Sequence, residues 1–541
     1  MTDTPDIQPA DAPHPVETDY ELGQDNISPF GLDIHNPVFL VSGISIVAFV
    51  IVTLMFQDQA SEFFTSLRNT LTTSLDWFFL SAANIFVLFC IFLMVTPLGS
   101  IRLGGRDASP DYSYMGWFAM LFAAGMGIGL MFFGVSEPMS HFASSMGGTS
   151  IENGARTDWA PLGGAAGDEV AARNLGMAAT IFHWALHPWA IYAVVALALA
   201  FFTFNRGLPL TLRSAFYPIL GERVWGWWGH IIDTLAVFAT LFGLATSLGF
   251  GTEQALAGLN FLFGTSTGPG AKVLLIAAIT ALALISVVRG LDGGVKVLSE
   301  INIAMAALLL LFVIVVGPTG TIFETIFSGG AAYVKELIPL SMPFGREDAN
   351  FASGWTAFYW AWWISWSPFV GMFIARVSRG RTVREFVFCV MIIPTIVCVL
   401  WMGAFGGTAI AQVMADAAAP VKDAALELKL FEMLKPLPLA GITSFIGIIL
   451  VLVFFVTSSD SGSLVIDTIT AGGKTDAPVA QRVFWCTFEG VVAATLLLVG
   501  GATALTALQA MAVSTGFPFT IVLLAMCVSL LIGLRQTQKE N

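Results

Sequence analysis

Long apolar runs alternate with short polar segments over most of the 541 residues. An apolar helix of about 18 or more residues can cross the roughly 30 Å hydrocarbon core of a bilayer. In lipid, every backbone polar group needs an internal partner, which leaves only helices and closed barrels. These runs are too long for barrel strands, which need only about ten alternating residues. The pattern predicts twelve spanning helices, near 37–56, 76–96, 114–139, 177–203, 225–252, 271–289, 295–317, 353–376, 384–410, 439–470, 481–500 and 504–534.

Composition supports an all-α polytopic membrane protein. Hydrophobic residues make up 56% of the chain and charged residues 11%, against about 25% charged residues in soluble domains. Residues 1–35 hold eight acidic residues and no Lys or Arg, which predicts a disordered acidic tail. This tail supplies much of the net charge of −13. The acidic pI therefore says nothing about the substrate, and no nucleic-acid partner is expected.

Lys and Arg positions predict the orientation. With a cytoplasmic N-terminus, the cytoplasmic segments hold fifteen of the twenty-four basic residues, four of them arginines in the short loop 376–384. Short cytoplasmic loops are enriched in Lys and Arg. We therefore expect both termini in the cytoplasm.

Two spans carry helix-weakening residues. The third contains Gly125, Gly127 and Gly129, and the eighth contains the Trp-rich segment 360–368, which ends in a proline. Paired interruptions in corresponding halves are the best sequence indication of a transporter's central site. Because these spans are five apart, the pattern favours two five-helix repeats of inverted topology, preceded by two accessory spans.

Tryptophans gather inside two spans. The eighth span carries five between residues 355 and 366, and the fourth adds Trp184, Trp189 and Tyr192. An interfacial aromatic belt or ordinary packing is one interpretation, but belts lie at helix ends and these clusters lie well inside. An aromatic cage is the other, since π faces bind methylated cations that lack an N–H donor.

The glycine break suggests a place for an anion. Free N–H groups and the positive end of a half-helix favour a carboxylate. A cation cage opposite such a break predicts a small zwitterion of betaine type as the ligand.

The tenth span presents hydroxyl groups at Thr457 and Ser458. Hydroxyl and freed carbonyl oxygens suit a small hard cation, although Ser and Thr also bond back to their own helix. Asp460 is an intramembrane acid and hence a functional candidate. His183 and His187 favour buried, hydrogen-bonded histidines over a metal site. We find no motif that indicates an enzyme, and no cofactor is expected apart from a coupling ion.

Four motifs together resemble the betaine/choline/carnitine transporter family over about residues 36–530. They are residues 125–129, residues 183–189 (HWALHPW), the segment 355–384 and residues 457–461. The resemblance implies a LeuT-like 5+5 inverted repeat over spans three to twelve, homotrimers, and a bacterial inner membrane. It divides the chain into the tail 1–35, accessory spans 36–110, a first repeat 111–317, an amphipathic periplasmic linker helix 318–350, a second repeat 351–534 and a short cytoplasmic tail 535–541.

Site residues follow from the same resemblance. The substrate box falls on Trp184, Trp189, Tyr192 and Trp363, with Trp362 and Trp366 lining the site or its exit and Trp360 backing it. Met126, Gly127 and Gly129 form the glycine break that faces the substrate. One sodium site uses carbonyls of Ala123, Met126 and Phe454 with the hydroxyls of Thr457 and Ser458.

Two departures from the family pattern matter. A second sodium site uses two threonines near a phenylalanine; here those positions read Thr240, Leu244 and Phe369, and leucine offers no oxygen. Choline carriers tend to place Asp where Gly129 stands, so Gly129 favours a zwitterion. The expected function is sodium symport of glycine betaine or dimethylsulfoniopropionate by alternating access. A proton-coupled or ion-independent carrier or exchanger of choline- or carnitine-like solutes is the alternative, and a membrane receptor is a third interpretation.

Overall fold

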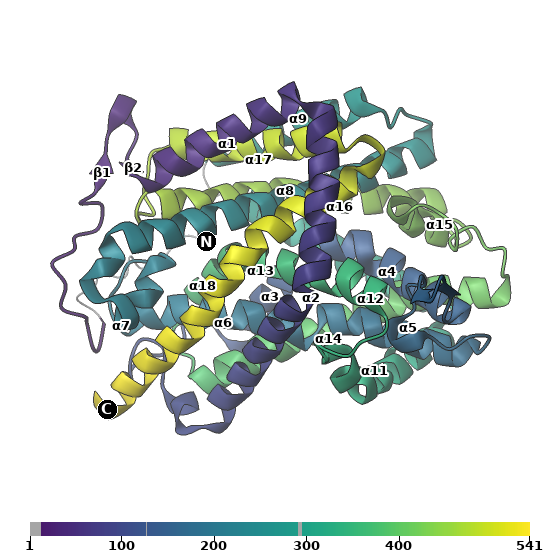
Figure 1. Ribbon diagram of the computed structural model, residues 1–541, viewed down its shortest axis with the longest axis horizontal. Helices are drawn as coiled ribbons and strands as arrows, with labels where there is room; N and C mark the ends of the chain where they lie inside the picture. Colours follow the sequence, from purple (N-terminus) through teal and green to yellow (C-terminus); the bar gives the residue numbers. More distant parts are fainter. Residues whose placement is uncertain (1–11, 126, 290–294, 541) are drawn as a thin grey trace.

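The computed structural model describes residues 12–125, 127–289 and 295–540, and they form an almost entirely helical protein (Figure 1). Two short hairpins are the strands within these residues: β1 (Asn26–Ile27) pairs with β2 (Ile34–His35), and β3 (Ile151–Glu152) pairs with β4 (Ala155–Arg156), both antiparallel. The all-α prediction is therefore confirmed.

The long helices follow the predicted runs. They are α1 (Val38–Met55), α2 (Gln57–Val95), α3 (Tyr114–Gly125), α4 (Ile128–Gly147), α5 (Glu169–Trp184), α6 (Leu186–Phe204), α8 (Trp227–Phe263), α9 (Pro269–Arg289), α10 (Val295–Val316), α11 (Thr319–Ser341), α13 (Phe358–Arg376), α14 (Val383–Ala415), α16 (Ala440–Thr470), α17 (Val479–Gly500) and α18 (Ala504–Glu540). Short helices α7 (Tyr217–Leu220), α12 (Ala349–Phe351) and α15 (Lys429–Leu434) lie between them.

Ten segments of the described chain, with α5 and α6 taken together, are long and apolar enough to cross a membrane. The other two expected spans correspond to the pair α3–α4 and to α12–α13. The division of spans three to twelve into inverted repeats stays a prediction.

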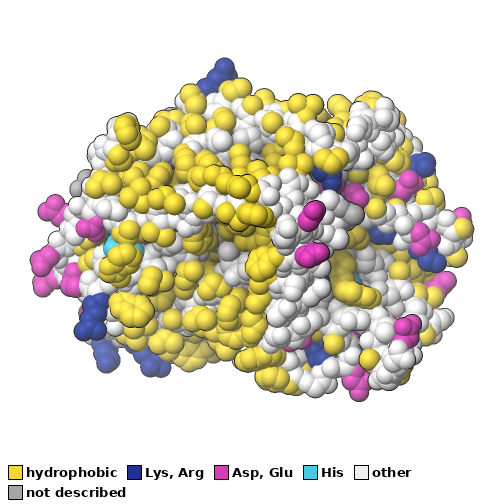
Figure 2. All heavy atoms as spheres, turned by 45° about the horizontal axis from the view of Figure 1, so that its top comes forward, with side chains coloured by type: hydrophobic (Ala, Val, Ile, Leu, Met, Phe, Trp, Pro, Cys, Tyr) yellow, Lys and Arg dark blue, Asp and Glu magenta, His cyan; other side chains and the backbone are white. Residues whose placement is uncertain are grey.

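Burial separates central helices from peripheral ones. In the most apolar window of α5–α6, 94% of the residues are buried, against 22% in that of α10. The fourth span is thus the centre of the bundle, and α10 lies at its edge. The long helices α2 and α18 pack against each other across one side (Figure 1). In Figure 2 hydrophobic side chains spread over the left and central parts of the face, and many of the charged ones lie toward its left and right ends, in keeping with a membrane belt.

The predicted break in the third span is confirmed. Helix α3 ends at Gly125 and α4 begins at Ile128, and Met126 lies outside the described residues. Gly127 between them is fully extended, with φ −171° and ψ −172°.

The predicted break in the Trp-rich segment is wrong. Helix α13 continues through Pro368. Proline leaves the carbonyl four residues earlier without its helical donor, and here the Ser367 hydroxyl donates to that Ile364 carbonyl at 2.7 Å. The irregular part lies upstream, as a π-helical turn over Ala352–Ala357.

A break that the hydropathy pattern missed lies in the fourth span. Ala185 leaves the helical region, with φ −104° and ψ −122°, between α5 and α6. Pro188 follows three residues later, and it has no N–H to donate to the carbonyl of Trp184. The prolines at 188 and 368 look alike in the sequence, but only the second has a serine that replaces the lost bond.

The acidic N-terminal segment is not disordered from residue 12 onward, so that prediction is wrong for the described part. The Tyr20 ring stacks on Trp225 at 4.1 Å, and its hydroxyl accepts from Arg213 at 2.7 Å. Asp33 pairs with Lys474 at 2.6 Å. Partners from distant loops order a segment whose own composition predicts disorder. Residues 1–11 of the predicted tail lie outside the described residues.

His35 completes this contact. Burial, with the nearby Arg213 charge, lowers the pKa of His35 to about 3. The imidazole is therefore neutral near pH 7, and its Nε2 accepts a hydrogen bond from Arg213 at 2.9 Å.

Both ends of the described chain lie on the same side. Glu540 pairs with Arg206 at 3.0 Å and lies 3.8 Å from His14. The predicted C-terminal tail 535–541 is helical through Glu540, as the last turns of α18. Arg206 of another loop provides an ion-pair partner for this final turn.

The predicted amphipathic linker forms as α11, a single helix despite its paired glycines. Gly329 faces α5, where an added Cβ would lie 2.8 Å from Met177 Cβ. Gly330 faces open space, with no atom within 4 Å of such a Cβ. Gly329 is therefore needed for the close contact between α11 and α5, whereas Gly330 is not.

This difference predicts opposite effects of the same substitution. Gly329→Ala should destabilise the protein by about 1–3 kcal/mol through overpacking, whereas Gly330→Ala should be neutral or stabilising by up to about 1 kcal/mol through helix propensity. Thermal unfolding of the purified variants in one detergent measures both. Equal shifts in the unfolding midpoint would contradict the packing assignment.

Candidate functional site

The third, fourth and eighth spans meet at the centre of the bundle. The eighth span, α13, packs on α6, and α4 of the third span packs on α5; α5 and α6 are the two halves of the fourth span. The break at Ala185 places Trp184 at the end of α5 and Trp189 and Tyr192 in the first turns of α6. Trp363 on α13 lies opposite them. The predicted box residues are thus brought together by an irregularity in the fourth span.

The rings of the box contact one another edge to face. Trp363 lies 5.1 Å from Trp184 at 88° and 5.4 Å from Tyr192 at 76°, between ring centroids. Trp189 lies 5.4 Å from Tyr192 at 77°. Trp184, Trp189 and Tyr192 are at most 2% exposed. In this conformation the rings close on each other, so a solute must part them or bind beside them.

The remaining tryptophans of α13 occupy different surroundings. Trp362 lies next to Trp363, with centroids 5.9 Å apart, and Trp366 packs on Phe369 at 5.1 Å. Trp360 is fully buried and stacks on His187 at 5.3 Å and 20°. It therefore lies behind the box and not at its surface.

A buried carboxylate behind the box is the feature that the sequence prediction missed. Glu137 Oε2 accepts from Trp184 Nε1 at 2.6 Å and from the Tyr359 hydroxyl at 2.5 Å. Its Oε1 lies 2.6 Å from His183 Nδ1 and 3.2 Å from His141 Nε2. Glu137 is fully buried. Two of these partners, Trp184 and Tyr359, come from different helices, α5 and α13.

Sequence signals for this network existed. An acidic residue inside a span is a functional candidate by default, and His141 follows Glu137 by four residues, on the same helical face. The partners on α5 and α13 lie far away in the chain, so only the fold shows them. Ligand atoms of Glu137, His141 and His183 lie within 4.8 Å of one another, and the hydrogen bonds between them account for this cluster.

The hydrogen bonds continue from His183 in two directions. Its Nε2 lies 2.9 Å from the Thr356 hydroxyl in the π-helical turn. Its backbone carbonyl accepts from Trp363 Nε1 at 3.1 Å. His183 is thus hydrogen-bonded and buried, in agreement with the prediction for it. It links Glu137 to Trp363, another tryptophan of the box.

The glycine break touches the box directly. A Cβ on Gly129 would lie 2.9 Å from the Trp184 ring and 3.2 Å from the Trp362 ring. A Cβ on Gly127 would meet nothing within 4 Å. Gly129 is therefore needed for ring packing, which adds a steric reason to the predicted role in substrate choice.

The predicted sodium ligands are only partly located. Phe454 is buried, and Ala123, Thr457 and Ser458 are half-buried. The Thr457 hydroxyl donates to its own helix, at 3.0 Å to the Val453 carbonyl, as the back-bonding interpretation expects. Met126 lies outside the described residues, so the full set is untested.

Packing does bring the glycine break toward α16. A Cβ on Gly251 of α8 would lie 3.1 Å from Ile128 and 3.3 Å from Val451. Ile128 opens α4, and Val451 lies on α16 six residues before Thr457.

Apolar packing occupies the region predicted for a second sodium ion. The Thr240 hydroxyl donates to its own helix, at 2.7 Å to the Ala236 carbonyl. Leu244 is buried against Gly462 of α16, where a Cβ would lie 2.3 Å from a leucine methyl group. Phe369 packs on Trp366 instead. Gly462 makes room for the leucine at this position.

Two cavities lie away from the box. One of about 270 Å³ is bounded mainly by aromatic side chains, among them Phe133, Trp159, Trp355 and Phe358, together with Arg68. Phe133 also contacts Trp184 and Trp362, with centroids 6.1 and 5.9 Å away. Phe133 therefore lies between this cavity and the rings around the box.

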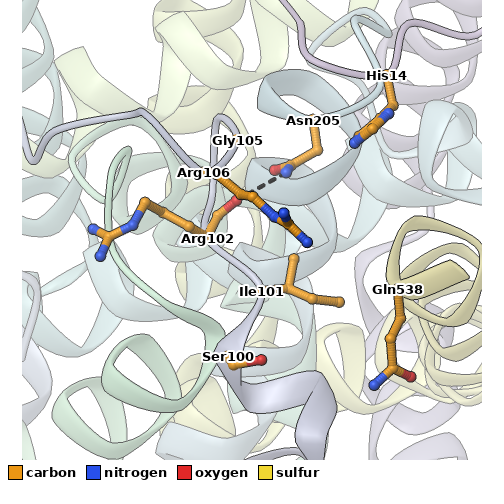
Figure 3. Close-up of a pocket in the computed structure, with 8 residues that line it drawn as sticks. All are labelled: His14, Ser100, Ile101, Arg102, Gly105, Arg106, Asn205 and Gln538. Atoms are coloured by element: carbon orange, nitrogen blue, oxygen red, sulfur yellow. Dashed lines mark hydrogen bonds between the residues drawn. The ribbon is translucent and has the colours of Figure 1, made fainter. Parts of the chain in front are cut away.

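The other cavity, of about 250 Å³, lies at the end where the termini meet. In Figure 3 the Arg106 side chain points into it between His14, Asn205 and Gln538, whereas that of Arg102 points away. Asn205 Nδ2 donates to the Arg102 carbonyl at 2.9 Å. The two cavities lie toward opposite ends of the bundle.

A helical membrane bundle with a buried aromatic box at broken helices defines a membrane transporter. Residues 37–539 match the family described as "BCCT, betaine/carnitine/choline family transporter". The chain belongs to this family, and it is a transporter and not an enzyme.

The chain is similar to several named transporters. It is 67% identical over 523 residues to a glycine betaine/proline/choline transporter of Vibrio parahaemolyticus, covering 96% of this chain and 94% of that protein. It is 56% identical to glycine betaine transporter 1 of the same organism, covering 96% and 97%. A glycine betaine transporter of Acinetobacter baylyi is 41% identical, covering 92% and 73%.

The two glycines of the break provide a matched test of the ring packing. Gly129→Ala should lower the unfolding midpoint, because Trp184 is held by Glu137 and cannot yield without a cost of about 1–3 kcal/mol. Gly127→Ala should retain the wild-type midpoint, since its Cβ has space and its backbone is extended. Thermal unfolding in detergent compares the two variants. An unchanged unfolding midpoint in Gly129→Ala would show that the Trp184 ring is free to move.

Proposed function

We propose that this chain is a secondary transporter that imports glycine betaine, with dimethylsulfoniopropionate as second candidate, by sodium symport. The observation that carries this proposal is the buried box of Trp184, Trp189, Tyr192 and Trp363. A methylated ammonium or sulfonium offers no hydrogen-bond donor, so π faces are suited to hold it, at about 0.5–2 kcal/mol for each ring.

The ring donors support a zwitterion over a simple cation. The indole N–H groups of Trp362 and Trp366, four residues apart on α13, are buried and make no hydrogen bond to another described residue. Such donors can pair with a substrate carboxylate. The glycine break at Gly127, with its open surroundings, adds backbone N–H groups nearby.

Related proteins support the same substrate class and widen it. The names of the Vibrio and Acinetobacter relatives share glycine betaine, and one of them adds proline and choline. Choline carries the methylated cation without the carboxylate, and proline carries the carboxylate without the methyl groups. We infer that both bind this chain more weakly than glycine betaine.

Sodium coupling rests on the hydroxyl pair Thr457 and Ser458, half-buried on α16. The packing of Leu244 against Gly462 supports a single sodium ion for each solute, because the second candidate site has an apolar side chain where an oxygen is needed. The broken helices around the box support transport by alternating access.

We place the protein in a bacterial inner membrane as a homotrimer with both termini in the cytoplasm. The shared side of the two termini agrees with an even number of crossings. Helix α11 supports assembly, because Phe327, Val334 and Ile338 on its outer face are 72–74% exposed. An apolar face of this kind needs lipid or a neighbouring subunit.

Uptake into proteoliposomes tests the function. Labelled glycine betaine should accumulate under an inward sodium gradient, and unlabelled betaine should compete better than choline, proline or carnitine. Simultaneous tracer measurements should give one sodium ion for each betaine. Accumulation driven equally by a proton gradient without sodium would favour the alternative carrier, and binding without counterflow would indicate a receptor.

Removing one ring tests the box itself. Trp363→Leu should raise the KM for betaine roughly three- to thirtyfold, the range expected for the loss of one cation–π contact. Trp227→Leu is the matched control, because Trp227 is 70% exposed at the start of α8. An unchanged KM in Trp363→Leu would remove Trp363 from the substrate site.

A further inference from the structure

The carboxylate of Glu137 lies directly behind one wall of the box. Its Oε2 accepts from the indole Nε1 of Trp184 at 2.6 Å. Hydrogen bonds from N–H groups to ionised oxygens fall near 2.7–2.9 Å, and they are about twice as strong as neutral ones. At 2.6 Å this contact is even shorter than that range, and it uses the one polar atom of the Trp184 side chain.

The surroundings of Glu137 agree with an ionised acceptor. Trp184 is a donor only, and the Tyr359 hydroxyl shares the same oxygen at 2.5 Å. The other oxygen faces ring nitrogens of His183 and His141 at 2.6 and 3.2 Å. Two donors, the indole N–H of Trp184 and the hydroxyl of Tyr359, therefore converge on Oε2, and the two imidazole nitrogens lie at the other oxygen.

A hydrogen bond to an anion changes the ring that donates it. Electron density moves from the N–H group into the indole, so the face of the ring becomes more negative. A cation over that face is then attracted more strongly, since cation–π attraction follows the negative potential of the ring face. In a dry interior this polarisation is screened less than in water.

We propose that Glu137 sets the selectivity of the site for a positively charged head group by polarising Trp184. Glu137 does not touch the solute; it is a positioning residue that acts through the ring. The inference rests on the proposed function, because it assumes that the methylated end of the solute contacts Trp184.

The same residue also fixes the box geometry, and the two roles must be separated. Glu137 holds Trp184 directly, and it holds Trp363 through His183, whose carbonyl accepts from Trp363 Nε1 at 3.1 Å. A role in geometry alone affects every ligand of the same shape equally. A role in polarisation affects the charged ligand more than a neutral-headed ligand of the same shape.

A carbon analogue of glycine betaine provides that comparison. In 3,3-dimethylbutanoate a carbon atom replaces the ammonium nitrogen, so the shape and the carboxylate are retained and the positive charge is lost. Equilibrium competition against labelled glycine betaine, with purified full-length protein at saturating sodium, gives the ratio of the two dissociation constants. This ratio is the preference for the positive charge.

Glu137→Gln removes the negative charge and keeps a carbonyl oxygen that can accept from Trp184. We expect the preference for betaine over 3,3-dimethylbutanoate to fall roughly three- to tenfold. Glu137→Asp, which keeps the charge, should recover at least part of that preference. If Glu137→Gln weakens both ligands by the same factor, or neither, polarisation is excluded.

Tyr359→Phe supplies a second test that does not depend on the folding of Glu137→Gln. It removes a competing donor from Oε2 and keeps both the ring and the carboxylate. The preference should therefore stay the same or rise, and a fall would overturn the proposal. Wild-type protein that binds no betaine would reject the proposed function and this inference together, whereas normal betaine binding with an unchanged Glu137→Gln ratio would reject the inference alone.

Discussion

The convergence of three helices on one buried carboxylate organises the centre of this protein. Glu137 on α4 is hydrogen-bonded to Trp184 on α5 and to Tyr359 on α13. A carboxylate removed from water at this depth requires hydrogen-bonding partners, since an unpaired charge would cost several kcal/mol. The network therefore fixes how α4, α5 and α13 meet, and it turns the Trp184 ring toward the ligand region.

Small residues make the close contacts around this centre possible. Gly129 lets α4 approach the Trp184 and Trp362 rings, and Gly243 does the same for α8 and Trp366, where a Cβ would lie 2.8 Å from the ring. Without a hydrophobic driving force between helices in lipid, association depends on such close packing and on interhelical hydrogen bonds. Large rings and glycines thus occur together because each ring needs a partner that leaves it space.

Several predictions from the sequence failed because they depended on hydrogen bonds and packing partners that the pattern of apolar and polar residues does not show. Helix α13 continues through Pro368, where the Ser367 hydroxyl satisfies the freed carbonyl. Pro188 accompanies a true break at Ala185. The acidic segment after residue 12 is ordered by Arg213, Trp225 and Lys474, partners that lie about 200 residues or more away in the chain.

The sequence by itself determined that most of the chain is helical and lies in a membrane, and its motifs, through their resemblance to a known family, predicted which residues form the aromatic box. The membrane location and the helical class follow from local quantities, namely the length of apolar runs and the position of charges. The tertiary structure decided which helix is broken at the box and how Gly129 and Leu244 are packed. It also showed that a carboxylate lies behind Trp184. Each of these depends on contacts between helices far apart in the chain, for which a hydropathy pattern carries no information.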